Sequence, residues 1–174
     1  MVLACVAVAV ATSSAQTSPA AAPNPFGEPA RTSTNHLTVE STLSHMTVSP
    51  GTRVTMSVNV LPRRAMHVYA PGKHDYQVVG LSITPEPWLR AEPTKYPPSE
   101  SYHFEPTNET IPVYSKPFRL TRDVTILATP EARQQLAGKS EVTIAGVLEY
   151  QACDDKLCYP PTKVPVRFTV PVKP

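Results

Sequence analysis

Cys153 and Cys158 are the residues of this chain that are best placed to do chemistry. They are separated by the four residues Asp-Asp-Lys-Leu, and the segments on both sides alternate apolar and polar residues. This pattern predicts a β-hairpin, in which opposite Cα atoms lie about 4.5 to 5.5 Å apart and a disulfide closes without backbone movement. We therefore expect the pair to switch between a dithiol and a disulfide.

The charged residues between the cysteines predict a slow nucleophile. Asp154 and Asp155 oppose the formation of a thiolate beside them, and Lys156 offsets only part of this effect. The two carboxylates are also typical turn residues. Such a pair is expected to exchange slowly with random thiols and quickly with a docked partner.

The spacing of the cysteines leaves two other uses open. In exported β-domains most cysteine pairs are structural, and closing so small a ring adds about 2 kcal/mol in a chain-entropy model. Copper(I) binding by the two sulfurs and a histidine is a further alternative, although His67, His74 and His103 do not have zinc-type spacing. We expect no metal and no cofactor. No GxSxG or other hydrolase motif occurs.

The domain that must position the cysteines is predicted to be all-β. The whole chain has 21 prolines and 6 glycines, a composition that disfavours long helices. The clearest alternation lies at 52–61, and further strands are expected at 37–43, 66–69, 76–83, 118–127, 141–152 and 163–170. About seven to nine short strands predict a two-sheet, immunoglobulin-like β-sandwich. One helical turn is expected at 130–137, with Thr129 as N-cap and Gly138 as the stop.

Strand alternation also predicts where the cysteines lie. Ile144, Leu148 and Tyr150 share one face of their strand, which places Cys153 on the opposite face and outside the main core. Pro160 and Pro161 have no N–H groups, so we expect a bulge between Cys158 and the last strand. Trp88 is expected to pack in the core or under a loop.

The first 15 residues are predicted to be a signal peptide. Residues 2–11 form a short apolar run, and Ser13-Ser14-Ala15 fits a cleavage site before Gln16. A lipobox around Cys5 is a weaker alternative, because most of the apolar run follows that cysteine. Cleavage removes Cys5 and leaves two thiols, which suits a periplasmic or secreted protein.

Composition and charge indicate the domain limits and the kinds of partner to expect. Residues 16–35 are rich in Pro and Ala and predict a disordered linker, whereas 36–174 predict one domain. The net charge of +2 comes from scattered residues without a basic stripe, so nucleic acid is not an expected partner. No segment after the signal peptide is long and apolar enough to span a membrane. We expect a monomer.

The cysteine hairpin resembles a known redox signature. Tyr150-Gln151-Ala152-Cys153 followed by Cys158-Tyr159-Pro160-Pro161 is similar to the amino-terminal periplasmic domain of DsbD, the membrane thiol:disulfide interchange protein. The sequences Met-His-Val-Tyr at 66–69 and Ile-Pro-Val-Tyr at 111–114 resemble strands of this family that lie near its disulfide. The resemblance extends from Leu37 to Val170.

This resemblance implies both a fold and an activity. The fold is immunoglobulin-like, and the activity is protein-disulfide reduction, with electrons exchanged with thioredoxin-like proteins or a membrane thiol reductase. By position, Cys158 resembles the cysteine that forms mixed disulfides, and Cys153 resembles the one that closes the internal bond. The implied surroundings of the disulfide are His67, Tyr69, Phe104, Tyr114, Asp154, Asp155 and Tyr159.

The chain also departs from this family. The best-known member has one more residue between its cysteines, and residues 96–109 occupy the region of its shielding loop, with Tyr102 or Phe104 as the candidate cap. The family's membrane domain and thioredoxin-like domain are absent from this sequence, so we expect another chain to be the reductant. A non-catalytic protein-binding sandwich with a structural disulfide is the competing class, which a reduction potential would distinguish.

Overall fold

The computed structural model describes residues 30–105 and 108–173. This part of the chain contains twelve strands, arranged in three antiparallel sheets, and one helix. The first sheet has the order β1 (Ala30–Ser33), β2 (Leu37–Leu43), β3 (Arg53–Pro62), β9 (Phe118–Ile126), β6 (Leu89–Ala91). The second has the order β12 (Thr162–Pro171), β10 (Glu141–Tyr150), β5 (Gly80–Ile83). The third has the order β11 (Ala152–Cys153), β4 (His67–Tyr69), β8 (Glu109–Tyr114), β7 (Glu100–Phe104), and the helix is α1 (Pro130–Leu136).

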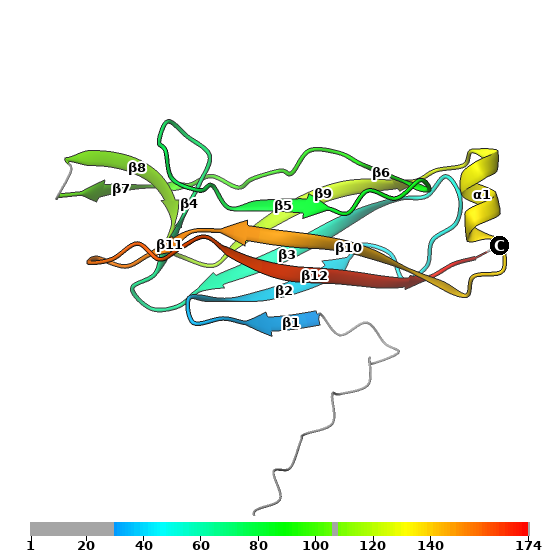
Figure 1. The fold of residues 1–174 in the computed structure, drawn as a ribbon, viewed down its shortest axis with the longest axis horizontal. Coiled ribbons are helices and arrows are strands. Elements are labelled where there is room, and N and C mark those ends of the chain that lie inside the picture. The colour runs from blue at the N-terminus through cyan, green and yellow to red at the C-terminus, as the bar shows by residue number, and fades with distance from the viewer. Residues whose placement is uncertain (1–29, 106–107, 174) are drawn as a thin grey trace, which may run out of the picture.

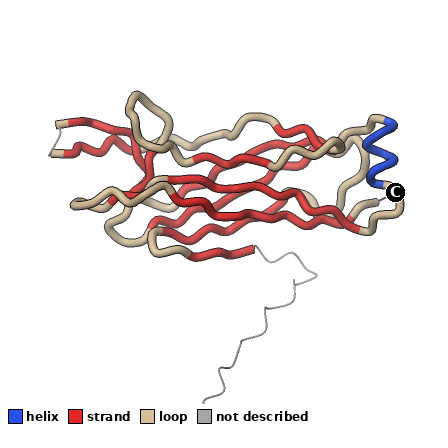
Figure 2. The backbone as a smooth tube through the Cα atoms, viewed as in Figure 1, coloured by secondary structure: helices blue, strands red, loops and turns tan. Residues whose placement is uncertain are grey.

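The first two sheets form the two layers of an immunoglobulin-like sandwich. Figure 1 shows β12, β10 and β5 in front of the sheet that contains β2, β3 and β9. The third sheet extends from one end of these layers, and α1 lies at the opposite end (Figure 1). Figure 2 shows that both long sheets run between these two ends. The sandwich therefore presents the third sheet, with its cysteine, at one tip.

The core lies between the two layers and follows from the alternation of the strands. β3 buries Val54, Met56, Val58 and Val60, while its intervening residues are half-buried. β10 and β12 are paired along their whole length, from Glu141 opposite Pro171 to Tyr150 opposite Thr162, and both show the same alternation. Burial of each such side chain contributes about 1.5 to 3 kcal/mol, which holds the layers together.

Most predicted elements are confirmed. The strand at 37–43 is β2, and the long strands β3, β9, β10 and β12 end within two residues of their predicted limits. Helix α1 begins after Thr129, whose side chain accepts a hydrogen bond from the N–H of Ala132 at 3.2 Å, and Gly138 follows it with a φ of +73°. Trp88 is buried in the main core, as expected.

Three details differ from the expectations. Strand β1 (Ala30–Ser33) lies within the predicted linker and pairs with β2 through its backbone. Its four residues are all exposed and have no apolar pattern from which a strand could be predicted. The strand expected at 76–83 is shortened to β5, because 70–79 form a loop across the third sheet. Twelve strands exceed the expected seven to nine, since pieces as short as β11 and β6 lack visible alternation.

The predicted signal peptide and linker residues 16–29 lie outside the described part of the chain. Within the described part, no helix has the length and apolar character needed to cross a membrane.

Candidate redox site

The two cysteines form a disulfide at the tip of the sandwich. β10 ends at Tyr150, and after Gln151 the chain continues as β11, which leaves β12 and pairs with β4 so that Cys153 lies opposite His67. Cys153 and Cys158 face each other in an isolated bridge with Cα atoms 4.1 Å apart, and their sulfurs are bonded. The predicted pairing and disulfide are confirmed, although the Cα atoms are closer than the expected 4.5 to 5.5 Å.

A bulge separates this bridge from the long ladder. Tyr150 is paired with Thr162 and Cys153 with Cys158, so two residues on one strand face three on the other. The additional residue falls in the stretch that contains Pro160 and Pro161, which cannot donate ladder hydrogen bonds. The bulge predicted from these prolines is confirmed, and it allows the cysteine hairpin to turn away from β12.

Asp154 organises the turn between the cysteines. Its Oδ1 accepts hydrogen bonds from the backbone N–H groups of Lys156 and Leu157 at 2.8 and 2.7 Å, and its Oδ2 accepts one from the Tyr159 hydroxyl at 3.0 Å. These donors, led by the N–H of Lys156, hold the pKa of Asp154 below its ordinary value. Asp154 thus stays ionised and fixes the loop, as expected for a turn residue.

The two sulfurs have very different surroundings. Cys153 is 1% exposed and belongs to a small apolar cluster with Tyr69, Ile111 and Val113, separate from the main core. Cys158 is exposed. The prediction that Cys153 lies outside the main core is confirmed, but its face is apolar and covered, because side chains from β4 and β8 pack against it. Of the two cysteines, Cys158 is therefore the more accessible to solvent.

The hydroxyl of Tyr69 contacts both sulfurs. Its Oη lies 2.9 Å from the Sγ of Cys153 and 3.2 Å from the Sγ of Cys158. Disulfide sulfurs carry no hydrogen, so the phenol is the donor in these contacts. Burial, the largest cause, and the neighbouring Tyr76 raise the pKa of Tyr69 to about 12. The group consequently remains protonated at neutral pH and can stabilise a sulfur on which negative charge develops.

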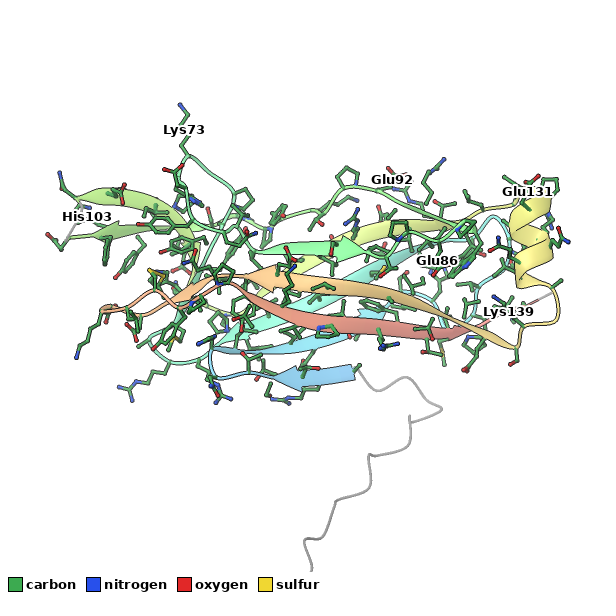
Figure 3. The ribbon with its side chains drawn as sticks, viewed as in Figure 1. Lys73, Glu86, Glu92, His103, Glu131 and Lys139 are labelled. Carbon is green, nitrogen blue, oxygen red and sulfur yellow. A yellow bond between two sulfur atoms is a disulfide. The ribbon has the colours of Figure 1, made fainter. Side chains whose placement is uncertain are left out.

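Aromatic rings surround this donor. The ring of Tyr76 stacks on Tyr69 with centroids 4.2 Å apart and planes 8° apart, and the Tyr76 hydroxyl donates to Glu109. The hairpin of β7 and β8 brings Tyr102 and Phe104 to a shallow depression that His67, Tyr69 and both cysteines also line. Both candidate cap residues therefore lie at the disulfide. In Figure 3, the labelled His103 marks this end, and Glu131 and Lys139 mark the opposite one.

Tyr102 connects the β7–β8 hairpin to the cysteine turn. Its ring lies 4.5 Å from the ring of His67, and its hydroxyl donates to Asp155 at 3.3 Å. Burial lowers the pKa of His67, against the opposing effect of Asp155 and Asp154. His67 is accordingly uncharged at neutral pH, which suits a residue that is 5% exposed and covered by an aromatic ring.

Two of the implied site residues pack toward the main core. The expectation that Tyr114 borders the disulfide is corrected. Strand alternation turns its side chain away from those of Ile111 and Val113 and into the main core. There its ring stacks on Phe118 at 4.2 Å, and its hydroxyl donates to the carbonyl of Pro97. Tyr159 directly follows Cys158 but packs half-buried on the main-core side. Its hydroxyl donates to Asp154, and its N–H donates to the carbonyl of Ala152 at 2.8 Å.

Comparison with known families is consistent with this geometry. Residues 34–169 match the family described as thiol:disulfide interchange protein DsbD, N-terminal. The chain belongs to this family. A similar solved structure is the N-terminal periplasmic domain of ScsB from Proteus mirabilis, with a TM-score of 0.56 and 13% identity over 81% of this chain. The match covers 50% of that structure, and at this identity it supports the fold alone. No curated protein matches the chain.

Some neighbours of the disulfide in this DsbD amino-terminal domain were not predicted from the sequence. Tyr76 lies in a loop whose local pattern gives no sign of its stack on Tyr69. Leu157, which precedes Cys158, was not singled out either, although an apolar residue directly after the polar run Asp-Asp-Lys is a visible signal. Among the described residues, no group of three or more histidine, cysteine or acidic residues is arranged to hold a metal ion.

Proposed function

We propose that this domain exchanges electrons with thioredoxin-like proteins through the Cys153–Cys158 disulfide. In the proposed reaction, a partner thiolate attacks the Sγ of Cys158 and forms a mixed disulfide. The Cys153–Cys158 bond breaks, and its electron pair moves to the Sγ of Cys153. A second thiol of the partner then attacks the mixed disulfide. The partner leaves as a disulfide, and this domain retains two thiols. The reverse sequence transfers the electrons onward.

The observation that carries this proposal is the unequal environment of the two sulfurs. Cys158 is exposed and open to attack, whereas Cys153 is buried against a protonated phenol that can stabilise the departing sulfur. A disulfide that serves only for stability needs neither an exposed cysteine nor an aligned donor. The position of the bond at the tip of the sandwich, away from the main core, also suits a bond that opens without unfolding the domain.

We further propose an exported location, with the first 15 residues acting as a signal peptide cleaved before Gln16. A periplasmic or secreted compartment permits disulfides to form and persist. The electron donor would then be a thioredoxin-like domain or membrane thiol reductase on another chain, and the acceptor another exported protein. The domain would work as a monomer, without a cofactor.

Trapping of the mixed disulfide tests this function. Cys158 of a Cys153→Ala variant is first coupled to thionitrobenzoate, and the partner is a reduced thioredoxin-like protein that lacks its second active-site cysteine. We expect the partner thiolate to displace thionitrobenzoate and leave a stable mixed disulfide with Cys158, detected by non-reducing electrophoresis and mass spectrometry. The matched Cys158→Ala variant keeps only the buried Cys153 and should form much less. The reduction potential of the wild-type protein is the second measurement. A potential below about −300 mV together with no trapped partner would identify the disulfide as structural.

A further inference from the structure

Leu157 stands out among the apolar side chains near the disulfide. It is 56% exposed, and in the described part of the chain only Met46 and Tyr96 are other large hydrophobic residues with an exposed surface. It belongs to neither apolar cluster, although it directly precedes the exposed Cys158. Its side chain thus contributes little to the fold and lies next to the sulfur that a partner must reach.

The turn holds this leucine in an ordered position. The N–H of Leu157 donates to Asp154 Oδ1 at 2.7 Å, and its carbonyl accepts from the N–H of Asp154 at 3.0 Å. Both backbone groups are therefore fixed before any partner arrives, and docking requires little further ordering of the chain. Figure 2 shows the loop between β11 and β12 projecting at this end of the sandwich.

The surroundings of Leu157 resemble a small interface patch. Pro160, two residues after Cys158, is also exposed, so exposed apolar residues flank Cys158 in the sequence. Asp155 and Lys156 are exposed beside them and supply a polar edge. An apolar centre with a polar rim is the usual composition of a protein interface. We define the docking tip as Leu157, Cys158 and Pro160.

We propose that the docking tip binds an apolar surface beside the reactive thiol of a redox partner, with Leu157 as its main contact. This inference rests on the proposed function. A mixed disulfide at Cys158 joins two sulfurs about 2.05 Å apart, so the partner's surface necessarily covers the residues adjacent to that sulfur. Leu157 is then transferred from water into the interface, which accelerates reaction with a fitting protein over reaction with small thiols.

A comparison of two reductants tests the docking tip. In a Leu157→Ala variant, we expect the second-order rate constant for reduction by reduced thioredoxin to fall about tenfold, from the loss of apolar area at the interface. Reduction by dithiothreitol, which is too small to use the tip, should stay unchanged. Met46→Ala is the matched control, because Met46 is an exposed apolar residue at 77% exposure near the α1 end, and both of its rates should equal those of the wild type.

The possible outcomes separate this inference from the proposed function. Equal rates for wild type and Leu157→Ala with thioredoxin would overturn the docking tip and leave electron exchange standing. A parallel fall with both reductants would also overturn it, because the leucine would then act on the disulfide itself. If dithiothreitol reduces the wild-type protein but thioredoxin does not, the proposed function and the docking tip both fail. Equal melting temperatures of the oxidised variants establish that all are folded.

Discussion

Removal of the Tyr69 hydroxyl should slow the opening of the disulfide and leave the fold intact. The hydroxyl donates to Cys153 Sγ at 2.9 Å, and this contact strengthens when the sulfur acquires negative charge as the leaving group. A hydrogen bond to a charged group contributes about 1.5 to 3 kcal/mol, equivalent to roughly 10- to 150-fold in rate. A Tyr69→Phe variant keeps the ring and its stack on Tyr76, so only the donor is lost.

The assay is reduction by dithiothreitol at neutral pH, quenched with acid, alkylated and quantified by mass spectrometry. The matched control is Tyr76→Phe, which removes the hydroxyl of the stacked ring, a group that contacts Glu109 and not the sulfurs. We expect Tyr69→Phe to react at least tenfold more slowly than both the control and the wild type. If all three proteins react at the same rate, the phenol does not stabilise the leaving sulfur, and the chemical role assigned to Tyr69 is refuted.

Two further predictions concern stability. The carboxylate of Asp123 has its pKa lowered by hydrogen bonds from Lys95, Thr55 and Arg53, so its stabilising effect is present above its unfolded pKa of about 3.9 and is lost as the pH falls below it. We therefore expect the free energy of unfolding, measured with urea, to fall more steeply for the wild type than for Asp123→Asn between about pH 6 and pH 3. Equal pH dependence of the two proteins would contradict this. Leu148 is 0% exposed, and Leu148→Ala should lower the free energy of unfolding by about 2 to 5 kcal/mol in chemical denaturation. Leu157→Ala, at an exposed position, should change it by less than about 0.5 kcal/mol, and a similar loss in both variants would show that Leu157 packs in the core.

The sequence predicts those strands in which burial of one face makes apolar and polar residues alternate. β2, β3, β10 and β12 each place apolar residues on one face, because one side of each strand packs against the other layer. The short strand β1 could not be predicted in this way. It is joined to β2 by backbone hydrogen bonds that any sequence can make, and its four side chains are exposed.

The site was predictable to the extent that its residues are close in sequence. The turn between Cys153 and Cys158 follows from local spacing and from the aspartates. The stack of Tyr76 on Tyr69 depends on how a loop folds back over β4, which is a tertiary contact without a local signal. The error at Tyr114 has the same origin: the aromatic residue was identified, but which face of β8 points to the disulfide depends on the pairing with β4.

The separation of the disulfide from α1 has a practical consequence. Val172 pairs with Val48, and this end of the chain lies beside α1, whereas β11, which contains Cys153, lies at the opposite end of the sandwich (Figure 1). A solid support or fluorescent label attached after Lys173 would therefore leave the reactive bond facing solution. Immobilised in this orientation, the protein offers a column on which redox partners can be captured and then released with a small thiol.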